Sequence, residues 1–348
     1  MKRTLAMAIL GSVIFYFSSQ ADCCTVFSVK NSDGRQVAKN FDWYIGDGLV
    51  AVNPRGARRI QAQKTNAHPI EWVSQYGSVS LTPFAPGFPV SGMNEKGLVV
   101  ESLHQLDFRQ RLIGGNRLIS LEWVQYVLDR FKTVEEVKRF AAQNGFGQVI
   151  LPVHFFISDE SGDSAIVSGQ GDNIQVVSGK QLPLPVLANR AYHKDLAQYR
   201  KFRQRSWLQK LFSNDGSDNR FGIVAGALNN GSLPTQTAIF KLLQAARIPS
   251  LTKWQIVWNQ THKSVTWRFF EGHRPQPGAS INFKQLDFSC RARPLVSSTQ
   301  SRQGAHFAPY SELDRTLATV RMQAIENALH AELSDDFVLA FAKPTQCQ

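Results

Sequence analysis

Cys24 is the residue of this sequence whose position matters most for chemistry. It is followed by Thr25, Val26 and Phe27, and it comes directly after a segment with the composition of an export signal. If that segment is removed, Cys24 becomes the first residue of the mature protein and carries both a thiol and a free α-amine. The thiol can attack a carbonyl carbon, and the amine can accept the proton of the thiol. The sequence therefore indicates a nucleophile that supplies its own base.

Residues 1–23 have the features of a signal peptide. Lys2 and Arg3 give a positive start, residues 5–17 form an apolar run, and small or polar residues follow. A helix that spans a bilayer needs about 20 apolar residues, so we expect no stable membrane anchor. The sequence therefore predicts an exported protein, either periplasmic or secreted.

The sequence leaves two alternatives for the position at which the signal is cleaved. The signal can be cut directly before Cys24, or after Ala21 with later trimming of Asp22 and Cys23. In either case residues 24–348 are enough to bury a sizeable core. We expect them to form a single domain that begins at the nucleophile.

The bulk composition is that of an ordinary folded protein, with 43% apolar and 19% charged residues. The formal net charge is +12. A basic secreted protein is the simplest interpretation, and attraction to anionic surfaces or acidic substrates is the alternative. The basic residues are scattered and no nucleic-acid-binding motif is present, so we expect no nucleic-acid partner.

The chain contains four cysteines, which are Cys23, Cys24, Cys290 and Cys347. Exported proteins meet oxidising conditions, in which disulfides form. If Cys24 stays reduced, Cys290 and Cys347 are the natural pair. No Cys-x-x-Cys spacing and no histidine cluster is present, so we expect no metal site and no cofactor.

Short strands dominate the predicted elements. A hairpin begins directly after Cys24 and turns at Ser32-Asp33-Gly34. Alternating or continuous apolar runs predict strands over 25–30, 36–41, 97–103, 152–158, 165–167, 173–177, 185–188, 254–258 and 264–270.

Three helices are predicted between and after these strands. Ser120 is expected to cap a helix over 121–131, and Thr133 with Glu136 forms a capping box for the next. An amphipathic helix is predicted over 311–329. Strand pairs separated by helices predict an α+β layered fold with largely antiparallel sheets.

Five segments, spread over most of the chain, matter together. They are Cys-Thr-Val-Phe at 24–27, Lys-Asn-Phe-Asp-Trp at 39–43, Gly-Met-Asn-Glu-Lys-Gly-Leu at 92–98, Pro-Val-Leu-Ala-Asn at 185–189 and Asn-Arg-Phe at 219–221. In this order and spacing they resemble the choloylglycine hydrolase family, also called linear amide C–N hydrolases, which includes bile salt hydrolases and penicillin V acylases. The resemblance runs from Cys24 to about Arg321. It implies an N-terminal-nucleophile hydrolase fold, a four-layer αββα sandwich with two largely antiparallel sheets.

The resemblance implies a role for five of these residues. Cys24 is the nucleophile, and Asp42 is the carboxylate near its amine. Asn94 and Asn189 build the oxyanion site, and Arg220 lies near the nucleophile. Each has a simpler alternative: a half-cystine for Cys24, a turn cap for Asp42, a turn residue at positive φ for Asn94, a helix cap for Asn189 and a surface ion pair for Arg220.

Lys39 is a departure from the family pattern. Bile salt hydrolases carry arginine just before the Asn-x-Asp triplet, and this chain has lysine there. A lysine is still a cation that favours a thiolate, although it lacks the planar fork of arginine. The alternative is a solvated charge on a strand. His154, in an apolar strand, is expected to be a core histidine.

The resulting functional prediction is a hydrolase of linear, non-peptide amide bonds that acts through an acyl-thioester intermediate. The predicted partner is a small-molecule N-acyl amide such as a penicillin V-like amide, an acyl homoserine lactone, a conjugated bile acid or an N-acyl amino acid. The alternatives are a non-catalytic basic protein that binds the cell envelope, and a peptidase or acyltransferase of the same fold. A homo-oligomer is compatible with the sequence.

Overall fold

The structure is a computed structural model that describes residues 24–61, 69–108, 118–147, 151–170, 173–204, 220–231, 233–291, 293–302, 304–329 and 346–347. The predicted signal segment, residues 1–23, lies outside the described residues, so the choice between the two cleavage points stays a prediction.

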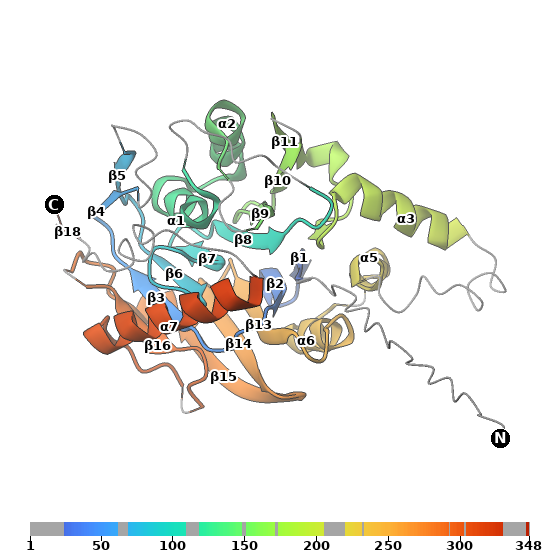
Figure 1. The fold of residues 1–348 in the computed structure, drawn as a ribbon. Helices are drawn as coiled ribbons and strands as arrows, with labels where there is room; N and C mark the ends of the chain where they lie inside the picture. Colours follow the sequence, from blue (N-terminus) through green and yellow to red (C-terminus); the bar gives the residue numbers. More distant parts are fainter. Residues whose placement is uncertain are drawn as a thin grey trace, which may run out of the picture.

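Two antiparallel sheets form the centre of the molecule (Figure 1). The first has six strands, in the order β12 (Val186–Leu187), β1 (Thr25–Asn31), β2 (Gly34–Asp42), β13 (Thr252–Asn259), β14 (Ser264–Glu271) and β15 (Arg274–Asn282). The hairpin predicted after Cys24 is confirmed as β1 and β2. Gly34, at the turn, has a φ of 103°, a backbone conformation that favours glycine.

The second sheet has nine strands. They are, in spatial order, β11 (Asn173–Ser178), β10 (Ser164–Gln170), β9 (Val153–Ser158), β8 (Val99–His104), β7 (Ser91–Asn94), β6 (Ser78–Thr82), β3 (Leu49–Asn53), β16 (Leu295–Ser298) and β17 (Ala308–Pro309).

A small third sheet involves the end of the described chain. Its order is β18 (Gln346–Cys347), β4 (Ala57–Ile60) and β5 (Glu71–Val73). A disulfide joins Cys290 to Cys347, so the predicted pairing of these two cysteines is confirmed.

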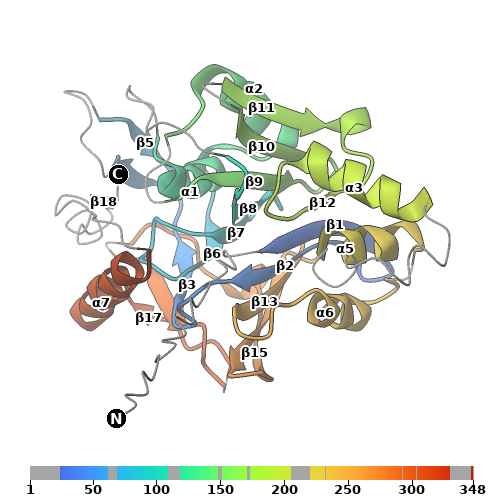
Figure 2. The ribbon, with the colours of Figure 1, turned by 45° about the vertical axis from the view of Figure 1, so that its right-hand side comes forward.

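Helices cover the outer face of each large sheet, as Figure 2 shows. On the nine-stranded sheet, α1 (Ser120–Arg130) packs on β7 and β8, and α2 (Val134–Asn144) packs on β10 and β11. On the six-stranded sheet, α5 (Arg220–Asn229) packs on β1 and β12, and α6 (Gln236–Ala245) packs on β2 and β13. The layers therefore follow the order helix, sheet, sheet, helix, which confirms the predicted α+β sandwich.

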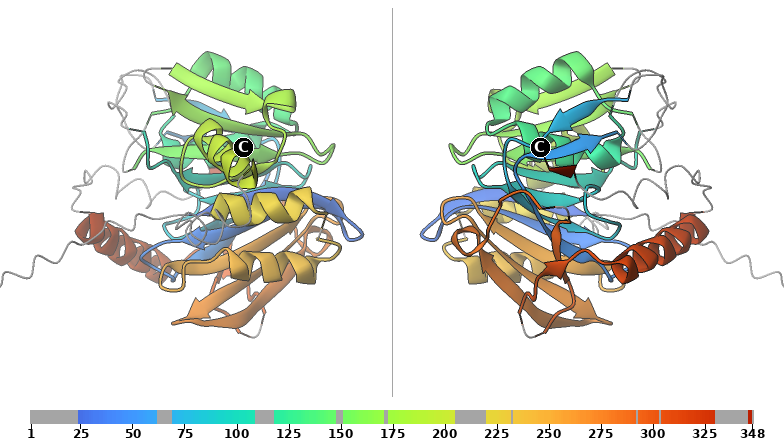
Figure 3. Two further views of the ribbon diagram at one scale, coloured as in Figure 1. Left: turned by 90° about the vertical axis from the view of Figure 1, so that its right-hand side faces the viewer. Right: turned by 90° about the vertical axis from the view of Figure 1, so that its left-hand side faces the viewer.

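Two further helices flank these layers. Helix α3 (Tyr192–Gln204) packs against α5. Helix α7 (Glu312–Leu329) lies at the opposite side of the molecule (Figure 3) and places Ala318, Met322 and Ile325 in the core. Two short 3₁₀ helices complete the described elements, η1 (Gly179–Gln181) and η3 (Phe283–Gln285).

The predicted helix starts have different outcomes. The Thr133–Glu136 capping box is present, with both of its hydrogen bonds. The predicted Ser120 cap is wrong, because Ile119 is the N-cap and Ser120 is already helical. The backbone N–H of Ser120 donates instead to the carbonyl of Gly147, at 2.7 Å, so contact with a distant segment fixes the helix start.

Candidate active site

The two large sheets bring several strand ends together at one end of the sandwich. In the six-stranded sheet, β1 begins directly after Cys24, next to the end of β2 at Asp42. In the nine-stranded sheet, β8 ends at His104 beside the start of β9 at Val153. Side chains that lie far apart in the sequence therefore meet at this end.

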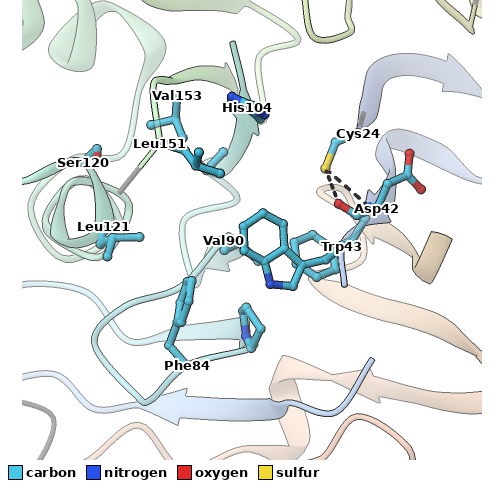
Figure 4. A pocket seen from close by; sticks show the side chains of 13 residues that line it. Cys24, Asp42, Trp43, Phe84, Val90, His104, Ser120, Leu121, Leu151 and Val153 are labelled. Atoms are coloured by element: carbon cyan, nitrogen blue, oxygen red, sulfur yellow. Dashed lines mark hydrogen bonds between the residues drawn. The ribbon is translucent and has the colours of Figure 1, made fainter. Parts of the chain in front are cut away.

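A pocket with an empty volume of about 590 Å³ lies there (Figure 4). Its wall is mostly apolar, and Cys24 contributes a thiol to it. The lining residues are Cys24, Phe41, Asp42, Trp43, Pro83, Phe84, Val90, Ser102, His104, Ser120, Leu121, Leu151 and Val153.

Cys24 is held by the backbone of the strand beside it. The N–H of Asp42 donates to Sγ of Cys24 at 3.4 Å, and the thiol contacts the carbonyl oxygen of Asp42 at 3.7 Å. The side chain is 4% exposed and takes no part in a disulfide, so the half-cystine alternative is wrong.

The carboxylate of Asp42 is turned away from the apolar cavity, as Figure 4 shows. It is fully buried, and Oδ1 accepts a hydrogen bond from the hydroxyl of Thr252 at 2.5 Å. Burial lowers the pKa of Lys253, and the negative charge of Asp42 opposes that effect. The structure thus places a buried carboxylate next to the thiol of Cys24.

Asn189 follows β12 and, like Asn94, is not itself among the residues that line the pocket. Its Nδ2 donates to the carbonyl oxygen of His104 at 2.7 Å, and its backbone carbonyl accepts from the N–H of Leu106 at 2.7 Å. These bonds fasten the segment after β12 to the end of β8. The side-chain amide is therefore held next to a residue that lines the pocket.

His154 supports the same segment from the neighbouring strand. It is fully buried, and its Nε2 lies 2.8 Å from the carbonyl oxygen of Ala188, the neighbour of Asn189. Burial lowers the pKa of His154 to about 4. The prediction of a core histidine is confirmed, and the neutral ring holds the backbone beside Asn189.

Asn94 has a different environment from the one that the resemblance implies. Its Nδ2 donates to the carbonyls of Leu128 and Phe131, at 2.9 and 2.7 Å, near the end of α1. Its Oδ1 accepts from the N–H groups of Lys96 and Leu98, at 3.0 and 3.1 Å. Asn94 is not among the pocket residues. Because both N–H groups of its amide are used in the fold, this geometry gives the oxyanion role no support.

The simpler alternative for Asn94, a turn residue at positive φ, is also wrong. The residue at positive φ is Gly97, at 82°, and not Asn94. Asn94 is therefore an amide that fastens a β-turn to a helix end.

Arg220 is the first residue of α5 and is partly buried. It is not among the residues that line the pocket. Burial raises the pKa of Asp195 on α3 to about 6, and the positive charge of Arg220 is one of the smaller effects that oppose this rise. The described contacts thus relate Arg220 to α3, and its proximity to the nucleophile stays a prediction.

Lys39 lies between the two sheets and is fully buried, so the alternative of a solvated strand charge is wrong. Its Nζ forms an ion pair with Oε2 of Glu101 at 3.0 Å. It also donates to the carbonyls of Val90 and Ser102, at 2.8 Å each. Lys39 is therefore beneath the pocket wall rather than in it.

The sequence did not identify His104 and the apolar wall as parts of the site. His104 follows a predicted strand, and a polar side chain at a strand end is the only signal it carries. Phe84, Leu121 and Leu151 come from separate segments without a chemical motif. Their gathering depends on the fold.

Two absences hold for the described part of the chain. No described helix is long and apolar enough to cross a membrane. Among the same residues, no group of three or more His, Cys, Asp or Glu side chains is arranged to hold a metal ion.

Comparison with known proteins places this site in a family context. The model of the family described as "Linear amide C-N hydrolases, choloylglycine hydrolase family" matches residues 24–238, and the match begins at Cys24. A penicillin V acylase of Pectobacterium atrosepticum is 33% identical in an alignment of 170 positions that covers 44% of this chain and 43% of that protein. The chain thus matches less than half the length of this curated relative.

Solved structures agree on the fold. A penicillin V acylase from Agrobacterium tumefaciens has a TM-score of 0.65 at 25% identity, covering 79% of this chain and 90% of that one. A mutant of a conjugated bile acid hydrolase from Clostridium perfringens has a TM-score of 0.62 at 16% identity, covering 83% and 100%. Since the family model spans more than half of the chain, this protein belongs to the choloylglycine hydrolase family of linear amide C–N hydrolases.

Proposed function

We propose that this protein is an exported amidase that hydrolyses the carbon–nitrogen bond of N-acyl compounds to an acid and an amine. The observation that carries the proposal is the thiol of Cys24 at the wall of an apolar pocket, beside the buried carboxylate of Asp42. The family membership supplies the reaction class. The signal at residues 1–23 supplies the route by which Cys24 acquires its amine.

The proposed reaction has two halves. The α-amine of Cys24, whose ordinary pKa is about 7.7–8.0, takes the thiol proton while sulfur attacks the amide carbonyl. The tetrahedral oxyanion collapses, the carbon–nitrogen bond breaks, and the leaving nitrogen receives that proton. Water then attacks the thioester while the α-amine takes one of its protons, the carbon–sulfur bond breaks, the sulfur recovers that proton as the thiol, and the acid is released. Asp42 acts as the counter-charge that holds the ammonium form of the amine.

Asn189 is the proposed donor to the oxyanion. Its amide is held rigidly by its bond to His104 and by the His154 contact with Ala188. A donor that is already in place when negative charge develops lowers the barrier without reorganisation. Removing one such donor typically slows kcat by about 10²–10³.

The pocket wall indicates the chemistry of the acyl group. Phe41, Trp43, Phe84, Val90 and Leu151 present apolar surface near the thiol. A charged acyl group would lose its hydration there without gaining a partner. We therefore propose an uncharged aromatic or aliphatic acyl group, which includes phenoxyacetyl and fatty acyl amides.

The test begins with the mass of the exported protein. We expect a mature chain that begins at Cys24, and hydrolysis of aryl-acetyl or fatty acyl amides in a panel that also includes conjugated bile acids. The variant Cys24→Ala should have no measurable activity, and Cys24→Ser should retain well under about 1% of the parent rate, since its hydroxyl is a far weaker nucleophile than a thiolate. Parent-like hydrolysis by both variants, or a mature chain that still carries residues before Cys24 while active, would contradict the proposal.

A further inference from the structure

A buried ion pair connects the two sheets directly beneath the pocket. Lys39 lies on β2 of the six-stranded sheet, and Glu101 lies on β8 of the nine-stranded sheet. Their Nζ and Oε2 atoms are 3.0 Å apart, and both side chains are 0% exposed. This contact therefore ties one sheet to the other in the interior.

Each member of the pair has further partners. The ammonium of Lys39 has three N–H groups, and its acceptors are Glu101 and the carbonyls of Val90 and Ser102. On the other side, Oε1 of Glu101 accepts from the hydroxyl of Ser91 and from Nε1 of Trp258, at 2.7 Å each. The donors of Lys39 are thus accounted for without the thiol.

These partners connect the pair to the pocket wall. Val90 and Ser102 both line the pocket, and the N–H of Ser102 also donates to the carbonyl of Val90 at 3.0 Å. The ammonium of Lys39 lies 5.6 Å from the ring centre of Phe41, a third lining residue. Wall residues from both sheets are therefore positioned by a single ammonium.

Trp258 adds a second connection between the sheets. It lies on β13 of the six-stranded sheet, and its bond to Glu101 reaches the nine-stranded one. A buried ion pair gains about as much from its attraction as it loses by desolvation, and apolar residues of similar volume are often as stabilising. Stability alone therefore gives no reason for this pair, whereas fixed geometry does.

We propose that Lys39 and Glu101 are positioning residues that set the spacing of the pocket walls, and that Lys39 is not the cation that activates the thiol. This inference rests on the proposed function for its meaning, because the spacing determines which acyl groups reach Cys24. It replaces the role that the sequence suggested for Lys39.

The main variant replaces both partners, Lys39→Met with Glu101→Met, so that no charge is left buried alone. The matched control is Arg59→Met with Asp129→Leu. It removes a second ion pair, 2.8 Å between Nε of the partly buried Arg59 and Oδ2 of the fully buried Asp129, and neither residue lines the pocket. Melting curves and far-UV circular dichroism verify that each variant folds.

The first measurement is the rate of Cys24 alkylation by iodoacetamide as a function of pH, with the modified residue identified by peptide mass. An opposite charge close to a thiol shifts its pKa by about 1–3 units, so we expect the same pH midpoint, within about 0.3, in the parent and in both double variants. A midpoint that rises by about one unit or more only in the Lys39/Glu101 variant would overturn the proposal.

The second measurement compares two reagents at the pH of the midpoint. The alkylation rate with N-benzyl iodoacetamide, divided by that with iodoacetamide, reports whether an apolar group fits beside the thiol. We expect this ratio to change at least five-fold in the Lys39/Glu101 variant and less than two-fold in the control. An unchanged ratio would overturn the proposal.

The reagent ratio does not require amidase activity, so the proposed function and the positioning role of Lys39 and Glu101 can be refuted independently of each other. A parent protein that hydrolyses no amide contradicts the proposed function, while the ratio still tests the positioning role. If the double variant does not fold, Glu101→Gln decides the matter, because it keeps the side-chain volume and removes the ion pair. We expect its ratio to change at least two-fold at a parent-like midpoint, and a parent-like ratio would overturn the proposal.

Discussion

Replacing Asn94 with alanine should weaken the fold and leave the chemistry intact. The amide of Asn94 makes four hydrogen bonds, with the backbone groups of Leu128, Phe131, Lys96 and Leu98. A hydrogen bond of this kind contributes about 0.5–1.5 kcal/mol. The four together predict a loss of about 4 kcal/mol in the free energy of unfolding, a large share of the roughly 5–15 kcal/mol typical of folded proteins.

The assay combines urea unfolding with hydrolysis measured well below the melting temperature. We expect kcat of Asn94→Ala, per folded molecule, to lie within about three-fold of the parent. If Asn94 donated to the oxyanion, kcat would fall by about 10²–10³ instead. The matched control is Asn189→Ala, for which we expect that fall in kcat with a smaller loss of stability.

The reasoning would be refuted by an Asn94→Ala protein that is as stable as the parent. It would also be refuted by a folded variant whose kcat falls a hundred-fold. If alanine prevents folding, Asn94→Gln keeps a side-chain amide with both donors and acceptors, and a smaller destabilisation with a parent-like kcat is expected.

Three further predictions follow from single contacts. Burial gives His154 a pKa of about 4 in the fold, against 6.5 in the unfolded chain. The stability that this group contributes is therefore complete above pH 6.5 and should fall by about 3 kcal/mol as the pH drops to 4. His154→Gln, compared by urea unfolding across this range, should lose less stability, and an equal loss would contradict the lowered pKa of His154. Thr252→Val removes the donor to Asp42 and should lower kcat about ten-fold at a cost of about 1–3 kcal/mol; parent-like kinetics would show that Asp42 needs no such support. Thr133→Ala opens the capping box of α2 and should cost about 1 kcal/mol without an effect on kcat, whereas a change in kcat would mean that α2 communicates with the site.

Local patterns account for the parts of the fold that the sequence predicted well. The hairpin that begins after Cys24 follows from alternation on either side of a Ser-Asp-Gly turn, and both its strands and its glycine are as expected. The Thr133 capping box is equally local. By contrast, α5 was not predicted, because Gly222 and Gly226 lower its helix propensity and its apolar residues lack a clear stripe. Its packing on β1 and β12 stabilises it instead.

In the candidate site, too, local features could be predicted from the sequence and features that depend on distant contacts could not. Cys24 and Asp42 could be placed together because they occupy adjacent ends of one hairpin. The surroundings of Lys39 and Asn94 could not be predicted, because their partners Glu101 and Leu128 belong to distant segments. A motif match fixes residue types along the chain, whereas the direction of each side chain depends on contacts that only the folded sheets create.

The covalent bond between Cys290 and Cys347 has a consequence for how the protein is produced. Strand β18 consists of Gln346 and Cys347 alone, and its pairing covers one side of β4. In a reducing cytosol the disulfide would not form, and only the pairing of these two residues would hold β18 against β4. Detachment would leave β4 with unpaired backbone groups along one side, a template for pairing with other chains. Recombinant production in an oxidising compartment should therefore give less aggregated material than cytosolic expression does.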